Sequence, residues 1–373
     1  ADGIGNKPGG SVTVLGDIIN VTEGALVSAS GSRGGAVTIG SPTSSSVNVA
    51  TGATLQATGS SGQAGTIMVQ GQLVGLEGTL DATSAQADGG QIEVKGADVS
   101  TAATSVINSS GFGSGGLINI RGSENLSIGG GRVLSEGQNG AGGRVIMTAP
   151  NTIVRENSEI SADGAAQGGN VNVGGGFQGK NASIPNATNT TIEAGATLSA
   201  DSTGGNAGSV VVWSNKDTIF YGDVRARALG TLGNGGMIEI SGKETLTVDG
   251  AIEASSVGGR SGTVLFDPGN VTIGNVGGAS IQNSTINDTL QGGTSVIIAT
   301  ESGNVTFLNS GVDNDRHDFI QWTNSNADLG VFASGSIVVQ NTIRTSGAGS
   351  INMIAGWTGT EGDLLPGGIF DPG

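Results

Sequence analysis

Residues 89–94 read Gly-Gly-Gln-Ile-Glu-Val, a pair of glycines followed by a short segment in which apolar and polar residues alternate. Alternation with a period of two is typical of a β-strand that buries one face. The same phrase recurs along the chain with two glycines or one, and its last glycine stands at positions 10, 35, 65, 90, 116, 143, 169, 208, 236 and 262. All but one of the intervals are 25 to 30 residues, which indicates a repeat architecture.

A second marker recurs at a similar interval. It is an apolar residue inside a Gly-x-Leu-x-Ala-like stretch. It falls at Leu26, Leu55, Leu80, Ile107, Leu134, Ile160, Leu198, Val224 and Ile252. A third short alternating segment lies between the two, as at residues 126–128 and 246–248. No window of 11 residues has apolar residues at helical spacing, so each unit of about 26 residues is predicted to hold three short strands and no helix.

One such unit cannot bury its apolar face alone, whereas stacked units bury a continuous axial core. The sequence therefore predicts an all-β fold, a parallel β-helix (β-solenoid) with three short strands per coil. The glycines are expected to allow positive φ at the corners and a close approach of neighbouring coils. Ten regular coils would form a rod of roughly 45–50 Å.

The composition excludes several other classes of protein. Glycine occupies 71 of 373 positions, but not every third one, and there are only 7 prolines, so the chain is not a collagen. With 35% apolar residues it does not have the composition of a charge-rich disordered chain. The absence of cysteine excludes disulfides and thiol chemistry. A net charge of −16 argues against nucleic acid and anionic membrane surfaces as partners, and no apolar run is long enough for membrane insertion as a helix.

The repeat is not uniform over the whole chain. Residues 1–273 are predicted to form a regular β-helix, interrupted by an excursion near 174–190 where one interval lengthens to 39 residues. Residues 274–373 are predicted to continue the same β-helix less regularly, with a second excursion near 311–326.

Several phrases between Gly174 and Ile273 occur in an order and spacing that resemble one known family. They are residues 175–179 (GGFQG), 184–187 (IPNA), 195–201 (GATLSAD), 208–214 (GSVVVWS), 235–243 (GGMIEISGK) and 265–273 (LFDPGNVTI). In these phrases the chain resembles the large haemagglutinin-type exoproteins of bacterial two-partner secretion, which are similar to filamentous haemagglutinin.

This resemblance implies a right-handed β-helix, export through an outer-membrane secretion pore, and service as an adhesin or fibre outside the cell or on the bacterial surface. The N-terminal secretion domain of that family, with its Asn-Pro-containing motif, has no counterpart here. The chain is therefore expected to be an internal β-helix segment.

Two glycine motifs could suggest nucleotide binding. Residues 174–180 spell G-x-x-x-x-G-K, but Asn181 stands where a phosphate-binding loop needs Ser or Thr, and no helix is predicted to follow. Residues 111–116 match G-x-G-x-x-G but lead into a predicted strand instead of the helix that a dinucleotide site requires. Both are interpreted as β-helix loops.

Two stretches with acidic residues could form sites. His317 lies among the acidic residues of 313–318, where the carboxylates could hold calcium or the histidine could act as a base, but a solvated loop is the favoured interpretation. The Asp-Pro-Gly phrases at 267–269 and 371–373 are interpreted as turns. No residue is assigned a catalytic, cofactor-binding or metal-binding role, and no cofactor is expected.

The tryptophans bear on ligand binding, because aromatic rings line many sugar sites. Trp213 is predicted to pack in the core or at a corner, whereas Trp322 and Trp357 could either pack inside or form a contact face. With 12 aromatic residues in the chain, a long aromatic groove for a glycan is not expected.

The leading functional hypothesis is a secreted, non-enzymatic β-helical rod that acts as a bacterial surface adhesin or structural fibre. The alternative is a β-helix enzyme acting on extracellular polysaccharide, which would need paired carboxylates in a groove. A third hypothesis, an ice-binding repeat, lacks regular Thr-x-Thr steps. The expected partners are a secretion pore, a glycan or protein on a host or neighbouring cell, and β-structure stacked on both ends, either further segments of a longer chain or identical subunits.

Overall fold

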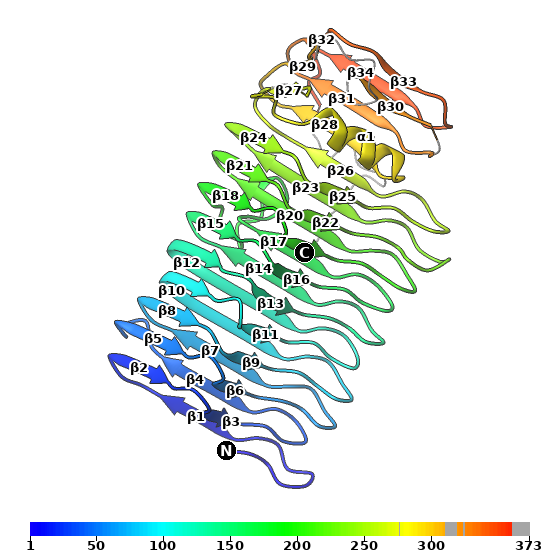
Figure 1. Ribbon diagram of the computed structural model, residues 1–373. Helices are drawn as coiled ribbons and strands as arrows, with labels where there is room; N and C mark the ends of the chain where they lie inside the picture. The colour runs from blue at the N-terminus through cyan, green and yellow to red at the C-terminus, as the bar shows by residue number, and fades with distance from the viewer. Residues whose placement is uncertain (276, 310–318, 324, 360–373) are drawn as a thin grey trace.

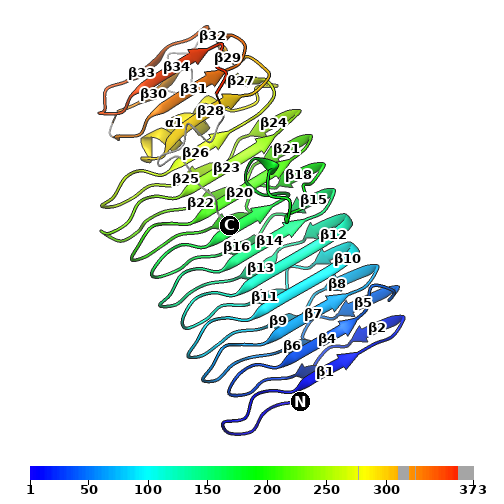
Figure 2. The same cartoon turned by 180° about the vertical axis from the view of Figure 1, so that it is seen from behind.

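The computed structural model describes residues 1–275, 277–309, 319–323 and 325–359. It is an all-β solenoid of about 12 turns built from parallel sheets, with three strands per coil and equivalent positions about 27 residues apart. The coils stack along one axis, with the N-terminal coil at one end and the C-terminal strands at the other (Figures 1 and 2). The predicted three-stranded β-solenoid is confirmed.

The ten strands that follow the repeat glycines form the first ladder, together with three later strands. In order these are β1 (Ser11–Val14), β4 (Ala36–Gly40), β7 (Thr66–Gln70), β10 (Gln91–Thr101), β12 (Leu117–Ile128), β14 (Arg144–Thr148), β17 (Asn170–Val173), β20 (Ser209–Ser214), β23 (Met237–Gly242), β26 (Thr263–Phe266), β28 (Ser295–Thr300), β31 (Leu329–Ala333) and β34 (Ile351–Ala355). Each strand pairs in parallel with its equivalent one coil away.

The second ladder shares β10 and β12 with the first, because these two strands are long enough to continue round the corner. It contains β2 (Ile18–Val21), β5 (Ser46–Val49), β8 (Leu73–Leu76), the C-terminal halves of β10 and β12, β15 (Asn151–Val154), β18 (Asn189–Ile192), β21 (Asp217–Phe220) and β24 (Thr245–Val248). A separate sheet of β27 (Val271–Ile273), β29 (Val305–Phe307) and β32 (Ile337–Val339) follows later in the chain.

The third ladder is made of short strands. It contains β3 (Leu26–Ser28), β6 (Thr54–Gln56), β9 (Thr79–Asp81), β11 (Val106–Asn108), β13 (Gly131–Leu134), β16 (Ser158–Ser161), β19 (Thr197–Ser199), β22 (Asp223–Arg225) and β25 (Ala251–Glu253). Farther along the chain, β30 (Ile320–Trp322) pairs with β33 (Ile343–Thr345).

Two of the apolar markers proposed from the sequence are wrong by one residue. Leu55 pairs with Val27, and Leu26 is 62% exposed; likewise Ile107 pairs with Val133 and not with Leu134. In both places two apolar residues are adjacent, so the period of two does not say which one points inward. The inward position of the third strand is therefore held by Val27 and Val133.

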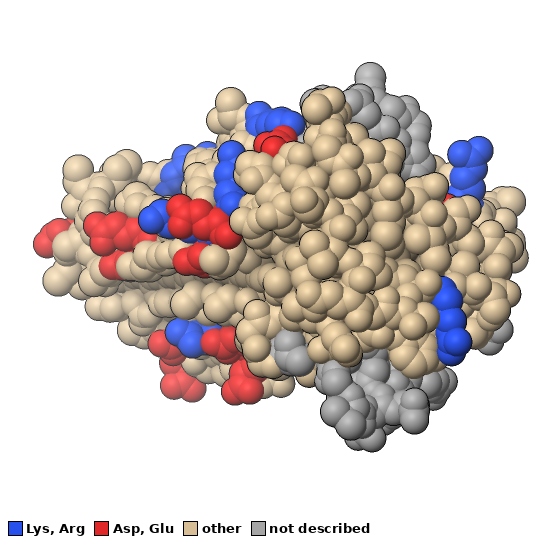
Figure 3. Space-filling model, turned by 90° about the horizontal axis from the view of Figure 1, so that it is seen from above, with Lys and Arg blue, Asp and Glu red and all other residues tan. Residues whose placement is uncertain are grey.

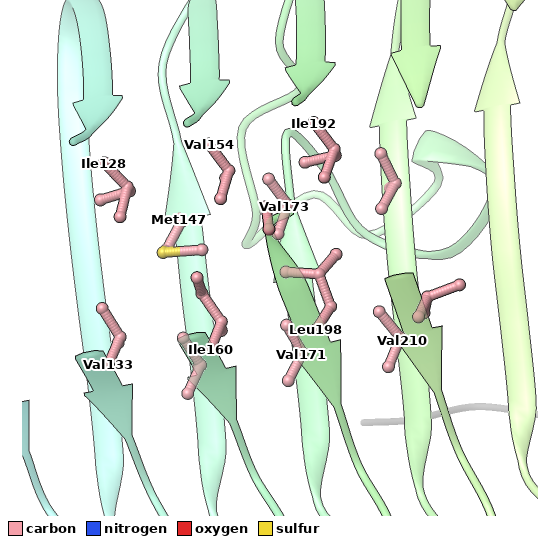
Figure 4. Close-up of a cluster of buried hydrophobic side chains, with 14 of the residues drawn as sticks. Ile128, Val133, Met147, Val154, Ile160, Val171, Val173, Ile192, Leu198 and Val210 are labelled. Carbon is pink, nitrogen blue, oxygen red and sulfur yellow. The ribbon is translucent and has the colours of Figure 1, made fainter. Parts of the chain in front are cut away.

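The core is a continuous column of aliphatic side chains between the three ladders. Equivalent residues of successive coils lie in rows along the axis (Figure 4), among them Ile128–Val154–Ile192 and Val133–Ile160–Leu198. All of these are at most 1% exposed. Full burial of one such side chain contributes about 1.5–3 kcal/mol, so each coil is stabilised by contact with the coils on both sides.

The repeat glycines are needed for close approach between coils. A Cβ on Gly116 would lie well inside 3.0 Å of the carbonyl oxygen of Gly90, and one on Gly143 would meet the carbonyl oxygen of Gly116 in the same way. None of the ten repeat glycines has a positive φ. Positive φ occurs instead at glycines such as Gly24 and Gly195, in turns between the second and third strands. Close approach between coils and positive φ, the two roles predicted for glycine, therefore belong to different glycines.

The loops that join a third strand to the next first strand are here called the corner loops, and Figure 1 shows them stacked along one side of the rod. Each is closed at its base by a backbone hydrogen bond, such as that from Gly169 N to Ala162 O at 2.7 Å. Parallel bridges such as Gly137–Gly164 and Gly164–Ser202 join one loop to the next. The corner loops therefore continue the hydrogen-bonded stack outside the three ladders.

One coil contains a helix, α1 (Asn283–Gln291), which packs between β25 and β30 and so occupies the place of a third strand. Its Ile286 and Leu290, one turn apart, are fully buried in the core. The prediction that no unit holds a helix is wrong here, because a segment of nine residues is too short to show a helical period over 11 residues. Within the described part of the chain, no helix has the length and apolar character needed to cross a membrane.

Candidate functional site: an axial strap and a polar groove

The excursion predicted near 174–190 lies across the outer face of the first ladder; residues 174–187 are here called the strap. At one side, Arg121 Nη2 of β12 donates a hydrogen bond of 3.1 Å to Ser183 O. At the other, Gln178 N in the 3₁₀ turn η1 (Phe177–Gly179) donates one of 2.9 Å to Glu239 Oε2 of β23. Strands β14, β17 and β20 lie between β12 and β23, so the strap runs along the axis and ties several coils together.

Glu239 anchors the strap with a carboxylate that is completely buried. Besides the backbone N–H of Gln178, it accepts a hydrogen bond of 3.0 Å from Ser241 Oγ. Gln178 has a φ of 53°, a left-handed conformation that costs free energy in a residue with a side chain. The hydrogen bond from Gln178 N to Glu239 stabilises this turn.

Apolar contacts surround the same anchor. Trp213, 1% exposed, lies on the outer face of β20 beneath the strap, and a Cβ on Gly175 or Gly179 would collide with its ring. Lys243 Nζ lies 5.8 Å from the centroid of that ring. The glycines of the G-x-x-x-x-G-K phrase thus make room for an indole ring. Trp213 is buried as predicted, although under a loop instead of in the axial core or at a corner.

The other tryptophans lie near the C-terminal end. Trp322 is fully buried and donates from Nε1 to Ala327 O at 2.9 Å, so the contact-face interpretation is wrong for this residue. Trp357 is partly exposed and packs against Phe332 with ring centroids 5.6 Å apart. Phe332 and Trp357 both pack against an outer apolar cluster, and Phe177 of the strap contacts the same cluster. Its members are Met237, Leu265, Ile297 and Ala299.

The remaining motifs are placed as follows. Residues 111–116 form a corner loop that leads into β12, with no helix after them. Residues 267–269 form the connection between β26 and β27. The acidic group around His317 and the second Asp-Pro-Gly phrase at 371–373 lie outside the described residues.

A polar groove of about 680 Å³ runs along the corner loops beside the third ladder. Its carboxylates are Glu136, Asp163 and Asp201, which stand at equivalent positions of three successive coils. Arg225 and Arg227 lie at one end, and the half-exposed Phe112 and Leu229 flank it. The sequence did not reveal this groove, because its three carboxylates are 27 and 38 positions apart. Their shared place, three residues after the inward residue of each third strand, is the signal that could have found them.

Hydrogen bonds from coil to coil fix these side chains. The backbone N–H of Asp201 donates to Asp163 Oδ1 at 2.7 Å, and that of Arg227 donates to Asp201 Oδ1 at 2.6 Å. The Arg227 guanidinium lies 2.8 Å from Asp201 Oδ2 and 2.9 Å from Glu253 Oε2. Asp163 and Asp201 therefore each hold the next coil in register, and both line the groove.

The three carboxylates affect one another. Burial raises the pKa of Asp163 above its usual 3.8, and the negative charges of Asp201 and Glu136 act in the same direction, against the opposing hydrogen bond from Asp201 N. The hydrogen bond to Asp201 raises the pKa of Arg227, so that guanidinium stays charged. The groove thus places the charged guanidinium of Arg227, a hydrogen-bond donor, beside carboxyl groups that accept hydrogen bonds.

Replacing Asp163 with asparagine tests this electrostatic arrangement. Because the folded state binds the Asp163 proton more tightly than the unfolded state, ionisation of Asp163 lowers stability as the pH rises from below 3.8 through the raised pKa. Asp163→Asn removes the charge and keeps the acceptor, so we expect a melting midpoint about 1–2 °C higher at neutral pH, with the advantage lost in acid. The exposed Asp249→Asn is the control; equal pH profiles of the two variants in thermal melts followed by circular dichroism would contradict this account.

Neither a scan against protein-family models nor a search of curated proteins finds a match to this chain. The resemblance to haemagglutinin-type exoproteins therefore rests on the phrases between residues 174 and 273 themselves.

Proposed function

We propose that this chain is a rod segment of a haemagglutinin-type exoprotein and acts outside the bacterial cell as a non-enzymatic adhesin or structural fibre. The observation that carries the proposal is the in-register stack of about 12 turns. At ~4.8 Å per coil it gives a rod of roughly 55–60 Å. A stack of this kind extends a surface away from its attachment point and presents the same positions repeatedly along its length.

The outer surface fits such a role. Outward positions of the strands are mostly small and polar, as in β5, where Ser46 and Asn48 alternate with the buried Val47 and Val49. In the view from above, charged side chains gather on one side, and the rest of that face carries few (Figure 3). Export through an outer-membrane pore and the extracellular location belong to the proposal through the family resemblance. The repeat favours such export, because strands that pair with the coil beside them can fold one coil after another.

The N-terminal coil supports the proposed end-to-end partner. Val14 is 38% exposed, whereas Ile39, its equivalent in the next coil, is fully buried. Leu15 and Ile18 of the same coil are 68% and 66% exposed. An open strand edge beside exposed apolar residues is suited to pairing with another coil. We include in the proposal that β-structure covers this end, either from further parts of the same chain or from an identical subunit stacked head to tail.

Adhesion is the direct test. Beads coated with the purified chain are expected to attach to epithelial or bacterial cells, whereas beads coated with serum albumin do not. Electron microscopy of concentrated chain tests the fibre role in parallel and is expected to show rods joined end to end. The proposal would be overturned if the coated beads do not attach to cells and the concentrated chain remains as single particles.

The polar groove favours one alternative, a β-helix enzyme acting on extracellular polysaccharide, because a row of carboxylates borders it. Against this, Asp201 is paired with Arg227, and both Asp163 and Asp201 accept backbone hydrogen bonds that hold neighbouring coils. New reducing ends released from neutral or acidic polysaccharide, and lost in Asp163→Asn, would establish the enzyme instead of the adhesin.

A further inference from the structure

The polar groove is elongated along the axis of the rod. Phe112 lies in the corner loop after β11 and Leu229 in the one after β22, and the third ladder makes four steps between these strands. Four steps at ~4.8 Å correspond to about 19 Å. The groove therefore fits a linear ligand laid along the stack.

Its lining can make hydrogen bonds in both directions. Glu136 and Asp163 carry acceptors, whereas the hydroxyl of Thr203 and the amide of Gln138 can also donate. Among the described residues, Arg225 forms no ion pair, and its buried Nε has no hydrogen-bond partner. The terminal nitrogens of the same guanidinium, on a residue that lines the groove, can donate to an acceptor that a ligand supplies.

Apolar contact is available at both ends. Phe112 and Leu229 are each 45% exposed, and both line the groove. The flat face of an aromatic ring offers a stacking surface for the C–H face of a sugar, while the polar side chains reach the hydroxyl groups. This combination of one ring and many short polar groups is suited to a polyhydroxylated chain.

An extended peptide fits less well. Peptides that bind along β-structure usually add a strand to a free edge. Here the backbone beside the groove is already used between coils, through the bridges Gly111–Gly137, Gly137–Gly164, Gly164–Ser202 and Ser202–Ala228. Recognition must therefore come from side chains.

Charge excludes an acidic ligand. Three carboxylates face two guanidiniums in the groove, and Arg227 is already paired with Asp201 and Glu253. The whole chain carries a net charge of −16, which repels polyanions.

We propose that the groove between Phe112 and Leu229 binds a linear, uncharged oligosaccharide along the axis of the rod. The inference rests on the proposed adhesin function and specifies the class of its ligand. Phe112 stacks on one sugar ring, Arg225 donates to a ring or hydroxyl oxygen, and Glu136 and Asp163 accept from hydroxyl groups.

The test uses the whole chain and immobilised neutral hexasaccharides, namely cellohexaose, xylohexaose, mannohexaose and maltohexaose, with hexagalacturonate as the acidic probe. We expect at least one neutral hexasaccharide to bind more tightly than its disaccharide, and Phe112→Ala and Arg225→Gln each to lower that affinity about tenfold. Tyr221→Ala is the matched control, since Tyr221 is 42% exposed and lies outside the groove; it should bind normally. Melting curves of all variants establish that each is folded.

The outcomes separate the two proposals. No binding of any neutral hexasaccharide, binding that Phe112→Ala leaves unchanged, or preference for hexagalacturonate overturns the groove assignment. If coated beads still adhere to cells in that case, the adhesin function stands without this ligand. If the beads fail to adhere although a neutral hexasaccharide binds, the groove assignment stands and the adhesin function fails.

Discussion

Gly116→Val is expected to destabilise the chain by about 3–5 kcal/mol, or to prevent its folding altogether. The new Cβ would overlap the carbonyl oxygen of Gly90 in the coil below. Relief would require two hydrogen-bonded coils to separate, and Gly116 lies in the middle of the stack, so coils on both sides would lose contacts. We expect a much lower denaturation midpoint in urea, followed by circular dichroism, and new protease cleavage around residues 90–143.

Gly277→Ala is the control for this experiment, because no atom lies within 4 Å of the position its Cβ would take. It changes the glycine content equally without forcing coils apart and should leave the midpoint unchanged. Equal midpoints for Gly116→Val and the wild-type chain would show that the coils can separate at little cost, which would contradict the close-packed glycine stack.

Glu239→Ala is expected to release the strap and cost about 3 kcal/mol. The substitution leaves Gln178 N and Ser241 Oγ without their acceptor in a buried place, and the left-handed turn at Gln178 loses its stabilising contact. Because Trp213 lies beneath the strap, its fluorescence should shift to longer wavelength as the ring meets water. Limited proteolysis should cut within residues 174–187 before any other site.

Glu93→Ala supplies a matched control. Glu93 holds the equivalent outward position of β10, pairs with Lys95 at 2.7 Å, and lies in a coil away from the strap. We expect this variant to change neither the fluorescence nor the cleavage pattern. A Glu239→Ala chain with the spectrum and protease resistance of Glu93→Ala would show that the strap is held by other contacts.

The sequence was sufficient to predict the architecture. Repeat glycines followed by alternating strands, as at residues 89–94, specify three strands per coil, since each element agrees with the same periodicity. It failed where that periodicity is ambiguous. At Val133 and Leu134 two adjacent apolar residues fit either face, and α1 is too short to show a helical period.

The strap and the groove were harder to predict from the sequence, for a different reason. The length of the excursion predicted a loop, but not that Gln178 would reach Glu239, 61 positions later in the chain. The groove likewise depends on which positions of successive coils lie above one another. A register error of one residue, such as that at Leu134, moves a side chain to the opposite face and would have hidden the alignment of Glu136 with Asp163.

Helix α1 interrupts the third ladder, whereas the first ladder continues past it from β26 to β28. In the part of the chain that the structure describes, strand-to-strand hydrogen bonds of the third ladder end at β25 and resume between β30 and β33, so α1 stands in this ladder without strand-to-strand pairing. Cooperative loss of structure spreads through neighbouring contacts, and a weaker boundary limits how far it travels. Thermal or tensile damage that begins in the C-terminal coils should therefore spread less readily past α1, and the groove, which lies wholly on the N-terminal side, should survive it.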